Sequence, residues 1–382
     1  MYVEWLSLND YRNYSSMEIK LGPGVISFVG SNGHGKTNLV EAITYLSSLS
    51  SHRVATDAPL VAVGAEQAVI RARVHRDDRS NLIELEINPG RSNRAQLNRS
   101  PITRPRELVG LLRTVIFAPE DLALVKGDPA ERRRFLDDLI VMRSPRMTSV
   151  RADYERVIRQ RNTLLKTLSG RGRSRRVEKD ENTESSLEEW NSHLVNLGAQ
   201  IIEARLQLTA ELQSTAASAY DSVSDKTGPL ELAYVSNIDQ TRGEGSGRAE
   251  IERALIETLE ERRQAEIDRG VSLVGPHRDE LAMSVRGLPV KGYASHGECW
   301  SAALALRLGS YELLRSDIGG GGEPVLILDD VFAELDALRR QRVADIVEAA
   351  DQVLITAAVA NDVPASLIGV RWSVRDGTVS RG

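Results

Sequence analysis

A glycine-rich segment near the N-terminus carries the residues best suited to chemistry. The segment reads Gly30-Ser31-Asn32-Gly33-His34-Gly35-Lys36-Thr37 and is followed by Asn38. This spacing matches the P-loop, whose glycines let backbone N–H groups turn toward a phosphate chain. Lys36 would reach the β- and γ-phosphates, and the Thr37 hydroxyl would ligate Mg²⁺. We therefore predict that residues 30–38 bind a nucleoside triphosphate together with its metal ion.

An acidic pair follows an apolar run in the C-terminal part of the chain. The run Val325-Leu326-Ile327-Leu328 is typical of a buried strand and leads into Asp329-Asp330. Asp329 would hold Mg²⁺ directly or through water, as the aspartate of a Walker B strand does. Asp330 stands where ATPases of the ABC type usually place a glutamate that orients the attacking water. Because Asp is one methylene shorter, we predict slow hydrolysis, with Lys36, Asp329 and Asp330 as catalytic residues.

A third motif, Ser295-His296-Gly297-Glu298, opens an apolar-rich stretch that should form a helix over residues 298–314. The pattern S-x-G-[QE] at a helix start resembles the ABC signature, and N–H groups at a helix N-terminus favour a phosphate. In ABC heads the signature touches the γ-phosphate held by the other protomer. Ser295 and Gly297 therefore predict an ATP-dependent homodimer with two composite sites, in which Ser295 takes part in catalysis. The alternative is that Ser295 only caps the helix.

Strands and helices that could position these motifs alternate along both ends of the chain. Hydrophobic periodicity predicts strands at 25–30, 68–74, 82–87, 114–118, 271–274, 281–285 and 352–357, and a helix at 37–46 that follows the P-loop. This order is typical of an α/β fold. We expect an ABC-type ATPase head built from residues 1–127 and 270–382.

Residues 128–269 differ in character and predict an inserted helical arm. Asp128-Pro129-Ala130-Glu131 has the residue types of a helix start. Helical spacing then continues to about Leu168 with a break near Pro145, and returns from Ala249 to Arg269, ahead of Gly270. Between these helices, a capping box at Ser186 should begin another one, along which apolar residues form a stripe for helix packing. We expect loops at 170–176, 240–247 and 319–322, and an acidic connector at 178–184.

Charge is distributed unevenly along the chain. The formal net charge is −5, yet the segment from Lys126 to Arg176 contains 15 Lys or Arg and 6 Asp or Glu. Such a basic block is either a solvated pair of helices or a surface that faces phosphates. On the second interpretation the candidate DNA-binding residues are Arg132, Arg133, Arg134, Arg143 and Arg146.

The amino-acid composition indicates the cellular compartment of the protein. A single cysteine, Cys299, excludes an intrachain disulfide and suggests a reducing compartment, where the thiol would be a small buried side chain. The N-terminal residues lack the pattern of a signal peptide, and no run approaches the roughly 20 apolar residues of a membrane helix. We expect a cytoplasmic protein without a membrane partner.

Several longer blocks resemble the RecF family of recombination mediators over nearly the whole chain. They are 8–14, 117–122, 125–127, 132–137, 275–279 and 328–336. The resemblance implies a weak, DNA-dependent ATPase that uses ATP and Mg²⁺ and binds DNA at boundaries between single strand and duplex. It also implies partners RecR and RecO, with which recombinase is loaded onto gapped DNA. One departure is Glu298, where many members have Gln.

Three short segments near these motifs leave two interpretations open. Ser51-His52-Arg53 either contacts DNA or nucleotide or forms a structural loop. Glu120-Asp121 either places Mg²⁺ or water or caps a helix. His277-Arg278 either senses nucleotide or is structural.

Other functions are compatible with a P-loop, and each has a feature against it. No histidine follows His296, so the switch histidine of transporter-type heads is missing. An SMC-like chromosome protein needs arms far longer than residues 128–269. A non-enzymatic DNA scaffold would not need Lys36, Thr37 and Asp329 intact.

Overall fold

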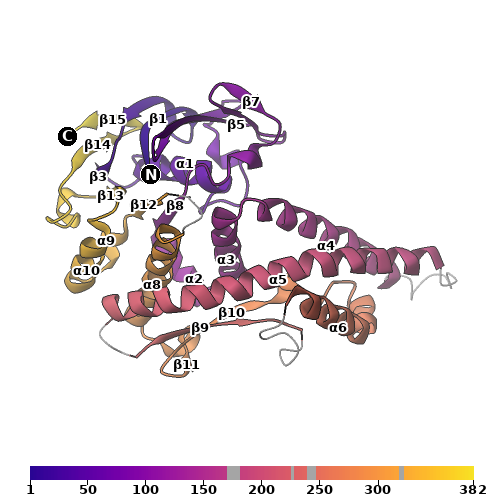
Figure 1. Ribbon diagram of the computed structural model, residues 1–382. Coiled ribbons are helices and arrows are strands. Elements are labelled where there is room, and N and C mark those ends of the chain that lie inside the picture. The colour runs from indigo at the N-terminus through magenta and orange to yellow at the C-terminus, as the bar shows by residue number, and fades with distance from the viewer. Residues whose placement is uncertain (170–180, 225–227, 239–246, 318–321) are drawn as a thin grey trace. The chain divides into compact units, whose positions relative to one another are not determined.

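The computed structural model describes residues 1–169, 181–224, 228–238, 247–317 and 322–382 (Figure 1). The chain folds into two compact units, each formed from separate stretches of the sequence. The head unit comprises 1–126, 214–230 and 285–382, and the arm unit comprises 127–213 and 231–284. Each is described separately below.

One sheet of the head unit is an antiparallel meander in its larger part. Its strand order is β2-β1-β4-β5-β6-β7. The strands are β1 (Tyr2–Tyr11), β2 (Tyr14–Lys20), β4 (Ala68–Arg76), β5 (Arg79–Ile87), β6 (Arg94–Leu97) and β7 (Ser100–Ile102). Along β4 the buried residues alternate, as expected for a sheet with one face on the core. The tight turn between β1 and β2 contains Arg12, which binds Glu41 of α1, and Asn13, which contacts the P-loop at His34.

The second sheet of the head unit is mostly parallel and carries the chemistry. Its order is β15-β14-β3-β13-β12-β8, and only β15 runs antiparallel to its neighbour. The strands are β3 (Gly24–Val29), β8 (Thr114–Phe117), β12 (Val325–Asp329), β13 (Gln352–Ala357), β14 (Val370–Arg375) and β15 (Thr378–Arg381). All residues of β12 and β13 are buried, as in a sheet covered on both faces.

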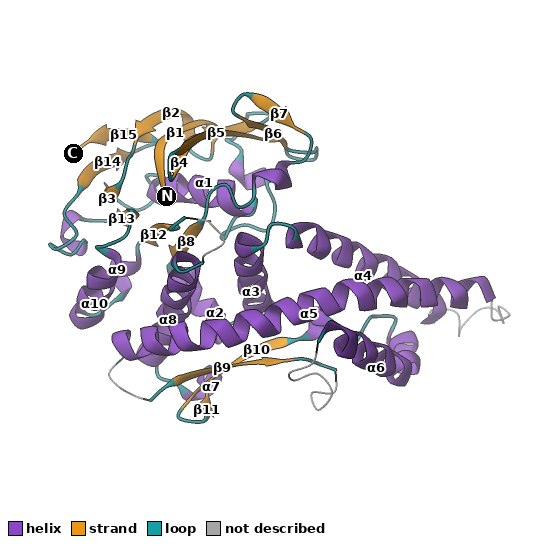
Figure 2. Ribbon diagram, in the orientation of Figure 1, coloured by secondary structure: helices purple, strands orange, loops and turns teal. Residues whose placement is uncertain are grey.

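Helix α1 (Lys36–Ser48) connects the P-loop to the core between the two sheets (Figure 2). Its residues Leu39, Val40, Ala42, Ile43 and Leu46 are fully buried. A helix that is apolar on nearly every side must be covered on more than one side. The two sheets provide this cover, so the start of α1 is held at the carboxyl ends of β3, β13 and β12.

Further helices complete the head unit around these sheets. They are η1 (Ala58–Leu60), η2 (Pro105–Leu108), η3 (Pro119–Asp121), α2 (Leu122–Lys126), α7 (Val290–Tyr293), α8 (His296–Arg315), α9 (Val331–Glu334), α10 (Ala337–Val347) and η7 (Ala360–Asp362). Helix α8 is buried along most of its length. At Gly309 a Cβ atom would lie 2.8 Å from the backbone N of Ala216. Glycine therefore lets α8 approach the last turns of α5 (Glu181–Val223) closely.

The arm unit is mainly helical. It contains α3 (Pro129–Arg143), α4 (Met147–Ser169), the larger part of α5, α6 (Arg248–Arg269), η6 (Pro276–Arg278) and most of β9 (Leu230–Val235) and β10 (Glu280–Val285). Strand β10 pairs with β9 and with β11 (Leu288–Pro289) in a small sheet.

Two buried ion pairs connect the arm helices. Arg161 of α4 binds Glu266 of α6 at 2.5 Å, and both side chains are buried. Arg205 of α5 holds Asp137 of α3 through two hydrogen bonds of 2.7 and 2.9 Å. Buried guanidinium groups require such complete pairing, since an unpaired charge in this setting is costly.

Most elements expected from periodicity are present. The strands at 25–30, 68–74, 82–87, 114–118, 281–285 and 352–357, the helices at 37–46, 249–269 and 298–314, and the break near Pro145 all correspond to observed elements. Helix α3 begins after Asp128 as expected. The expected loops lie outside the described residues, except for Gly247, Gly322 and positions 181–184.

Two expectations about local structure are wrong. The helix expected to begin at Ser186 already begins at Glu181, so Ser186 does not mark its start. Residues 271–274 form no strand, because side chains accept their backbone N–H groups. Ser272 donates to Asn162 Oδ1 (2.7 Å), and Leu273 and Val274 donate to the Glu266 carboxylate (2.7 and 3.3 Å).

The boundaries between the units also differ from those expected. The head was expected to resume at residue 270, whereas the observed head unit resumes at 285 and includes 214–230. The difference arises because residues 271–284 bond mainly to the arm helices, as the hydrogen bonds of Glu266 show.

In the part of the chain that the structure describes, no helix combines the length and apolarity needed to span a membrane.

Candidate nucleotide-binding site

The P-loop lies between β3 and α1, as its sequence predicts. Residues Gly30, Ser31, Asn32, Gly33 and His34 form the loop, and Gly35 caps α1 in a left-handed conformation with φ of 109°. A Cβ atom on Gly35 would lie 2.6–2.8 Å from side-chain atoms of Asn13 and Tyr14. Glycine is thus required there both by its backbone conformation and by its neighbours.

Lys36 is held at the centre of this loop. Its side chain is buried, and Nζ donates to Ser31 O (3.4 Å) and Asn32 Oδ1 (3.3 Å). Both hydrogen bonds are long and end on neutral oxygens, so they compensate a buried ammonium group poorly. Phosphate oxygens would be stronger acceptors for this cation. Its position suits contact with the end of a triphosphate.

Two threonines surround the buried carboxylate of Asp329. Thr37 Oγ1 donates to Asp329 Oδ1 at 3.0 Å, and Thr356 Oγ1 of β13 donates to the same atom at 2.6 Å. Burial raises the pKa of Asp329 to about 6, a change that the hydrogen bond from Thr356 opposes and the nearby charge of Asp330 increases. The carboxylate thus lacks a full counter-charge.

This geometry fits a magnesium ion. A hydroxyl and a carboxylate oxygen meet at the carboxyl ends of β12 and β13 and the start of α1, and oxygen ligands are those that Mg²⁺ prefers. A divalent cation there would stabilise the ionised form of Asp329. Thr37 and Asp329 are therefore the chain's candidate ligands, with phosphate oxygens and water completing the coordination.

Two hairpin turns support the P-loop from outside. Asn13 Nδ2 donates to His34 O (3.1 Å), and Tyr14 Oη donates to Gly35 O (3.1 Å). On the other side, the backbone N–H of Asp376, in the turn between β14 and β15, donates to His34 Nδ1 at 3.0 Å. The neighbouring Gly377 has φ of 73°, and a Cβ on it would lie 2.4 Å from Asn13 O. The two turns therefore pack against each other beside the loop.

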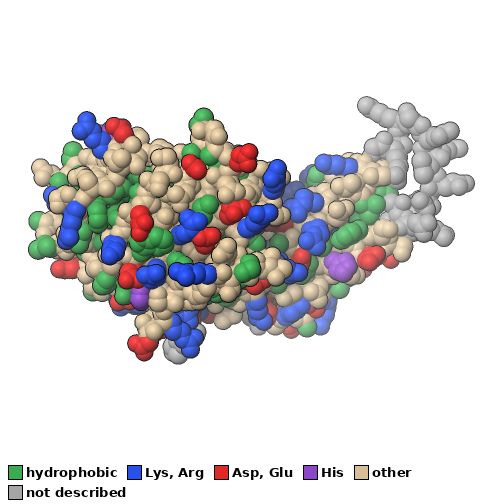
Figure 3. All heavy atoms as spheres, turned by 90° about the horizontal axis from the view of Figure 1, so that it is seen from above, with side chains coloured by type: hydrophobic (Ala, Val, Ile, Leu, Met, Phe, Trp, Pro, Cys, Tyr) green, Lys and Arg blue, Asp and Glu red, His purple; other side chains and the backbone are tan. Residues whose placement is uncertain are grey.

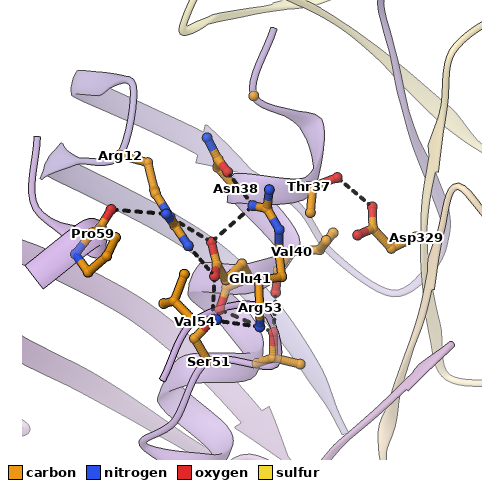
Figure 4. Close-up of polar contacts among 12 residues, drawn as sticks. Arg12, Thr37, Asn38, Val40, Glu41, Ser51, Arg53, Val54, Pro59 and Asp329 are labelled. Atoms are coloured by element: carbon orange, nitrogen blue, oxygen red, sulfur yellow. Dashed lines mark hydrogen bonds and ion pairs between the residues drawn. The ribbon is translucent and has the colours of Figure 1, made fainter. Parts of the chain in front are cut away.

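Behind the P-loop, a buried carboxylate organises three side chains (Figure 4). Glu41 of α1 is fully buried and accepts two hydrogen bonds from Arg12 (2.9 and 2.6 Å). It also accepts a hydrogen bond from Ser51 Oγ (2.5 Å) and forms an ion pair with Arg53 (3.5 Å). Burial alone would raise the pKa of Glu41, but the hydrogen bonds from Arg12 and Ser51 and the charge of Arg12 lower it.

Ser51-His52-Arg53 is thus a loop whose outer members bind Glu41. Arg53 additionally donates to Asn38 Oδ1 at 2.9 Å, which connects the loop to the residue after Thr37. Between them, His52 has both ring nitrogens buried without a hydrogen-bond partner among the described residues. Burial lowers the pKa of His52, so its neutral form is favoured at neutral pH.

The signature motif forms the start of α8. Ser295 is the N-cap: its hydroxyl accepts the N–H of Glu298 (3.2 Å), and the Glu298 carboxylate accepts the N–H of Ser295 (2.8 Å). Glu298 also binds Arg286 at 2.8 Å. The carboxylate here completes a capping box and an ion pair, which is a structural reason for Glu in place of Gln. A Cβ on Gly297 would lie 3.2 Å from Arg339 Nη2.

Two acidic residues of the predicted motifs, Asp121 and Asp336, have mainly structural contacts. Asp121 accepts the N–H of Ala118 (2.9 Å) and binds Arg307 of α8 (2.6 Å), which matches the helix-capping interpretation. Asp336 is the N-cap of α10 and accepts the N–H of Arg339 at 2.9 Å. In contrast, the side chain of Asp330 is partly exposed, and its backbone, at φ of 51°, donates to Thr356 Oγ1 (2.9 Å).

The candidate DNA-binding arginines have different environments within the arm unit. Arg132 is only 5% exposed and binds both oxygens of Glu280 at 2.7 Å, which argues against a contact with DNA. Arg133 is half-buried and donates to Asp279 O (2.8 Å). Arg134 lies 3.7 Å from Asp138, and Arg143 pairs with Glu211. Arg146 is exposed.

The remaining sequence candidates take structural positions. His277 accepts or donates a hydrogen bond with Tyr154 Oη (2.8 Å), and Arg278 donates to Ser272 O (2.9 Å), both inside the arm unit. Cys299 is buried, and burial raises the pKa of its thiol, as expected for an inert cysteine.

Several residues of the site escaped sequence reasoning. They are Asn13, Tyr14 and Asp376, which bond to the P-loop, Thr356, which bonds to Asp329, and Glu41, which pairs with Arg53 behind the loop. Two features of the sequence indicate Glu41 and Asp376. A glutamate among the apolar positions of 37–46 indicates a buried partner, and Asp376-Gly377 between two short strands predicts a tight hairpin turn beside the sheet.

Comparison with known proteins decides which family contains this site. The family model described as RecF/RecN/SMC N terminal domain matches residues 2–372. The DNA replication and repair protein RecF of Streptomyces avermitilis is 55% identical over 383 residues, which cover 100% of both chains. This chain belongs to the RecF family.

Solved structures agree with membership of the RecF family. The structure of the recombination mediator protein RecF-ATPrS in the RecFOR pathway has a TM-score of 0.88 and 28% identity, covering 100% of this chain and 98% of that one. An Smc head domain derived from Pyrococcus furiosus matches with a TM-score of 0.55 and 18% identity, over 99% of this chain and 95% of that one, which is a likeness of fold alone. Both the ABC-type head fold and the resemblance to RecF are confirmed.

Proposed function

We propose that this RecF-family protein binds Mg-ATP, closes into a dimer on DNA at a boundary between single strand and duplex, and reopens after slow hydrolysis. The hydrogen bond from Thr37 to Asp329 supports this most directly, because it joins the P-loop to the Walker B carboxylate in one buried site. Lys36 would bind the phosphates, and Ser295 and Gly297 would contact the γ-phosphate on the other protomer. RecO and RecR are the proposed partners in recombinase loading.

A clamp of this kind needs a surface for DNA phosphates. Arg133, Arg134, Arg143 and Arg146 remain candidates for it after the exclusion of Arg132. The likeness to a structure of RecF in the RecFOR pathway supports this role over a transporter subunit. Contacts of this type give binding that is independent of sequence and weakened by salt.

Nucleotide-dependent DNA binding can be tested with a labelled duplex that carries a single-stranded gap. We expect Mg-ATP to tighten binding, measured by fluorescence anisotropy, and a rise from 50 to 200 mM salt to weaken it by orders of magnitude, roughly 10³-fold for about six phosphate contacts. Lys36→Ala should remove the ATP effect and keep the weaker, ATP-independent binding. Binding that is indifferent to ATP and to Lys36 would contradict the switch, and absence of binding would contradict the DNA role.

Asp330→Asn should separate nucleotide binding from hydrolysis. Asn adopts positive φ readily, so the backbone at this position should be retained. Loss of a general base usually slows a reaction by about 10²–10⁴-fold. We therefore expect slow turnover, unchanged ATP affinity and an accumulated dimer, measured by phosphate release, ATP titration and light scattering. A variant that stays monomeric with saturating ATP would contradict the proposed closure.

A further inference from the structure

A pocket in the arm unit has no assigned role. It encloses about 460 Å³ between α3, α4, α5 and η6, and all its lining residues belong to the arm unit. This volume falls in the range of about 300–1,000 Å³ that is usual for small-molecule sites. Its lining combines apolar side chains, among them Ile158, Ile201 and Pro276, with five arginines and two carboxylates.

Positive charge at this pocket is only partly compensated. Arg205 is fully paired with Asp137, and Arg151 lies 3.3 Å from the same carboxylate. Arg159, in contrast, is largely exposed, and its one ion pair within the described residues is a long one of 3.8 Å with Glu155. Arg133 donates one hydrogen bond to a neutral carbonyl, Asp279 O. The pocket can therefore accept an anion without breaking a buried ion pair.

Burial and nearby charges lower the pKa values of two groups that line the pocket, Arg133 and His277. Burial and the nearby charge of Arg205 lower the pKa of Arg133. Burial lowers the pKa of His277 to about 4, with further lowering from Arg278, Arg133 and Arg161. Burial is the largest cause of both shifts, and a bound anion would offset its cost for the charged Arg133, as the carboxylates of Glu280, Asp279 and Asp137 already do in part. Figure 3 shows Lys and Arg side chains on both halves of the face that it draws, mixed with Asp and Glu.

We propose that this pocket takes one unpaired nucleotide of a DNA strand, with its phosphate near Arg133 and Arg159 and its base against Ile158, Ile201 and Pro276. This inference rests on the DNA binding proposed above. A paired base cannot enter a pocket of this size without leaving its duplex, whereas an unpaired one can do so at low cost. The pocket would thus distinguish a single-stranded overhang from a blunt duplex, which phosphate contacts alone cannot do.

Variants of α3 and α4 can test this without changing the ATP site. Ala130 is exposed in the first turn of α3 and lines the pocket, so Ala130→Trp should obstruct it while keeping every charge. Arg159→Gln removes a rim charge. Arg156→Gln is the matched control, because Arg156 lies on the same helix with similar exposure (68% against 69%) and does not line the pocket.

The probes are a duplex with a short overhang, a blunt duplex of equal length, and free dTMP as competitor, all with Mg-ATP present. We expect Ala130→Trp and Arg159→Gln to weaken overhang binding by roughly tenfold and remove most of its advantage over the blunt duplex. Arg156→Gln should weaken both duplexes equally. Free dTMP at millimolar concentration should not displace the overhang.

Three results would overturn the inference. If both pocket variants keep the preference for the overhang, the pocket does not bind the unpaired nucleotide. Binding of the blunt duplex would still support the proposed DNA role. Displacement of the overhang by free dTMP would assign the pocket to a free nucleotide. If neither duplex binds, the proposed DNA role itself fails, and the pocket assignment fails with it.

Discussion

Glu41→Ala should lower the free energy of unfolding by about 3–5 kcal/mol, as expected when one member of a buried ion pair is removed. Arg12, Ser51 and Arg53 all use this carboxylate, which is fully buried between the P-loop helix and the 51–53 loop. The change would leave the Arg12 guanidinium half-buried without its counter-charge. Asp153→Ala is a suitable control, since among the described residues Asp153 has a single, exposed ion pair with Arg156, and its loss should cost at most about 1 kcal/mol.

Urea denaturation followed by tryptophan fluorescence can measure this, because Trp5, Trp300 and Trp372 lie in the head unit. The effect should also depend on pH. The folded-state pKa of Glu41 is lowered, so its contribution is present above the ordinary value of 4.5 and is lost as the pH falls through the lower folded value. If Glu41→Ala destabilises no more than Asp153→Ala at pH 7, the network is not important for folding.

Asp329→Asn should stabilise the protein in chelator and yet abolish Mg-dependent hydrolysis. The folded-state pKa of about 6 exceeds the ordinary 3.8, so the folded chain binds this proton more tightly than the unfolded chain. Without a metal ion, the contribution of Asp329 to stability therefore falls as the pH rises from about 4 to about 6, by about 3 kcal/mol in total. Asn can accept the hydroxyl protons of Thr37 and Thr356 without carrying the charge.

The test compares wild type and Asp329→Asn in EDTA at pH 5 and pH 7.5, and then with Mg-ATP. We expect the variant to be more stable at pH 7.5, with a smaller gain at pH 5, and to lose hydrolysis by at least about 100-fold. Wild type alone should gain stability from Mg-ATP in a strongly Mg²⁺-dependent way. A variant that is less stable than wild type in EDTA at both pH values would show that the carboxylate is already compensated.

The sequence predicted the P-loop, the Walker B strand and the start of α8 as local structures because their motifs are local. The P-loop, Asp329 and the start of α8 each depend on a few adjacent residues and on one strand or helix. Thr356 and Asp376 could not be found in this way. They reach Asp329 and His34 only because β13 lies beside β12 and the β14–β15 turn lies beside the P-loop, and this strand order is a property of the folded sheet.

The net charge of a segment predicted less about the arm unit than the spacing of motifs predicted about the head unit. The block from Lys126 to Arg176 is basic as a sequence, but α3 and α4 place its arginines in different environments. Arg132 and Arg161 are buried in ion pairs, whereas Arg146 and Arg159 are exposed. A net charge cannot distinguish these positions, because burial depends on which face each helix packs against α5, α6 and β10.

The two turns that meet beside His34 have a consequence for biosynthesis. Asn13 is translated long before Asp376-Gly377, yet both lie against the same loop. Four parallel neighbours in the sheet, β3, β13, β12 and β8, likewise come from distant parts of the chain. A nascent polypeptide thus cannot complete its phosphate-binding loop until residues 376–377 have been synthesised and have left the ribosome. A chain interrupted before residue 376 would leave this loop without one of its two supports.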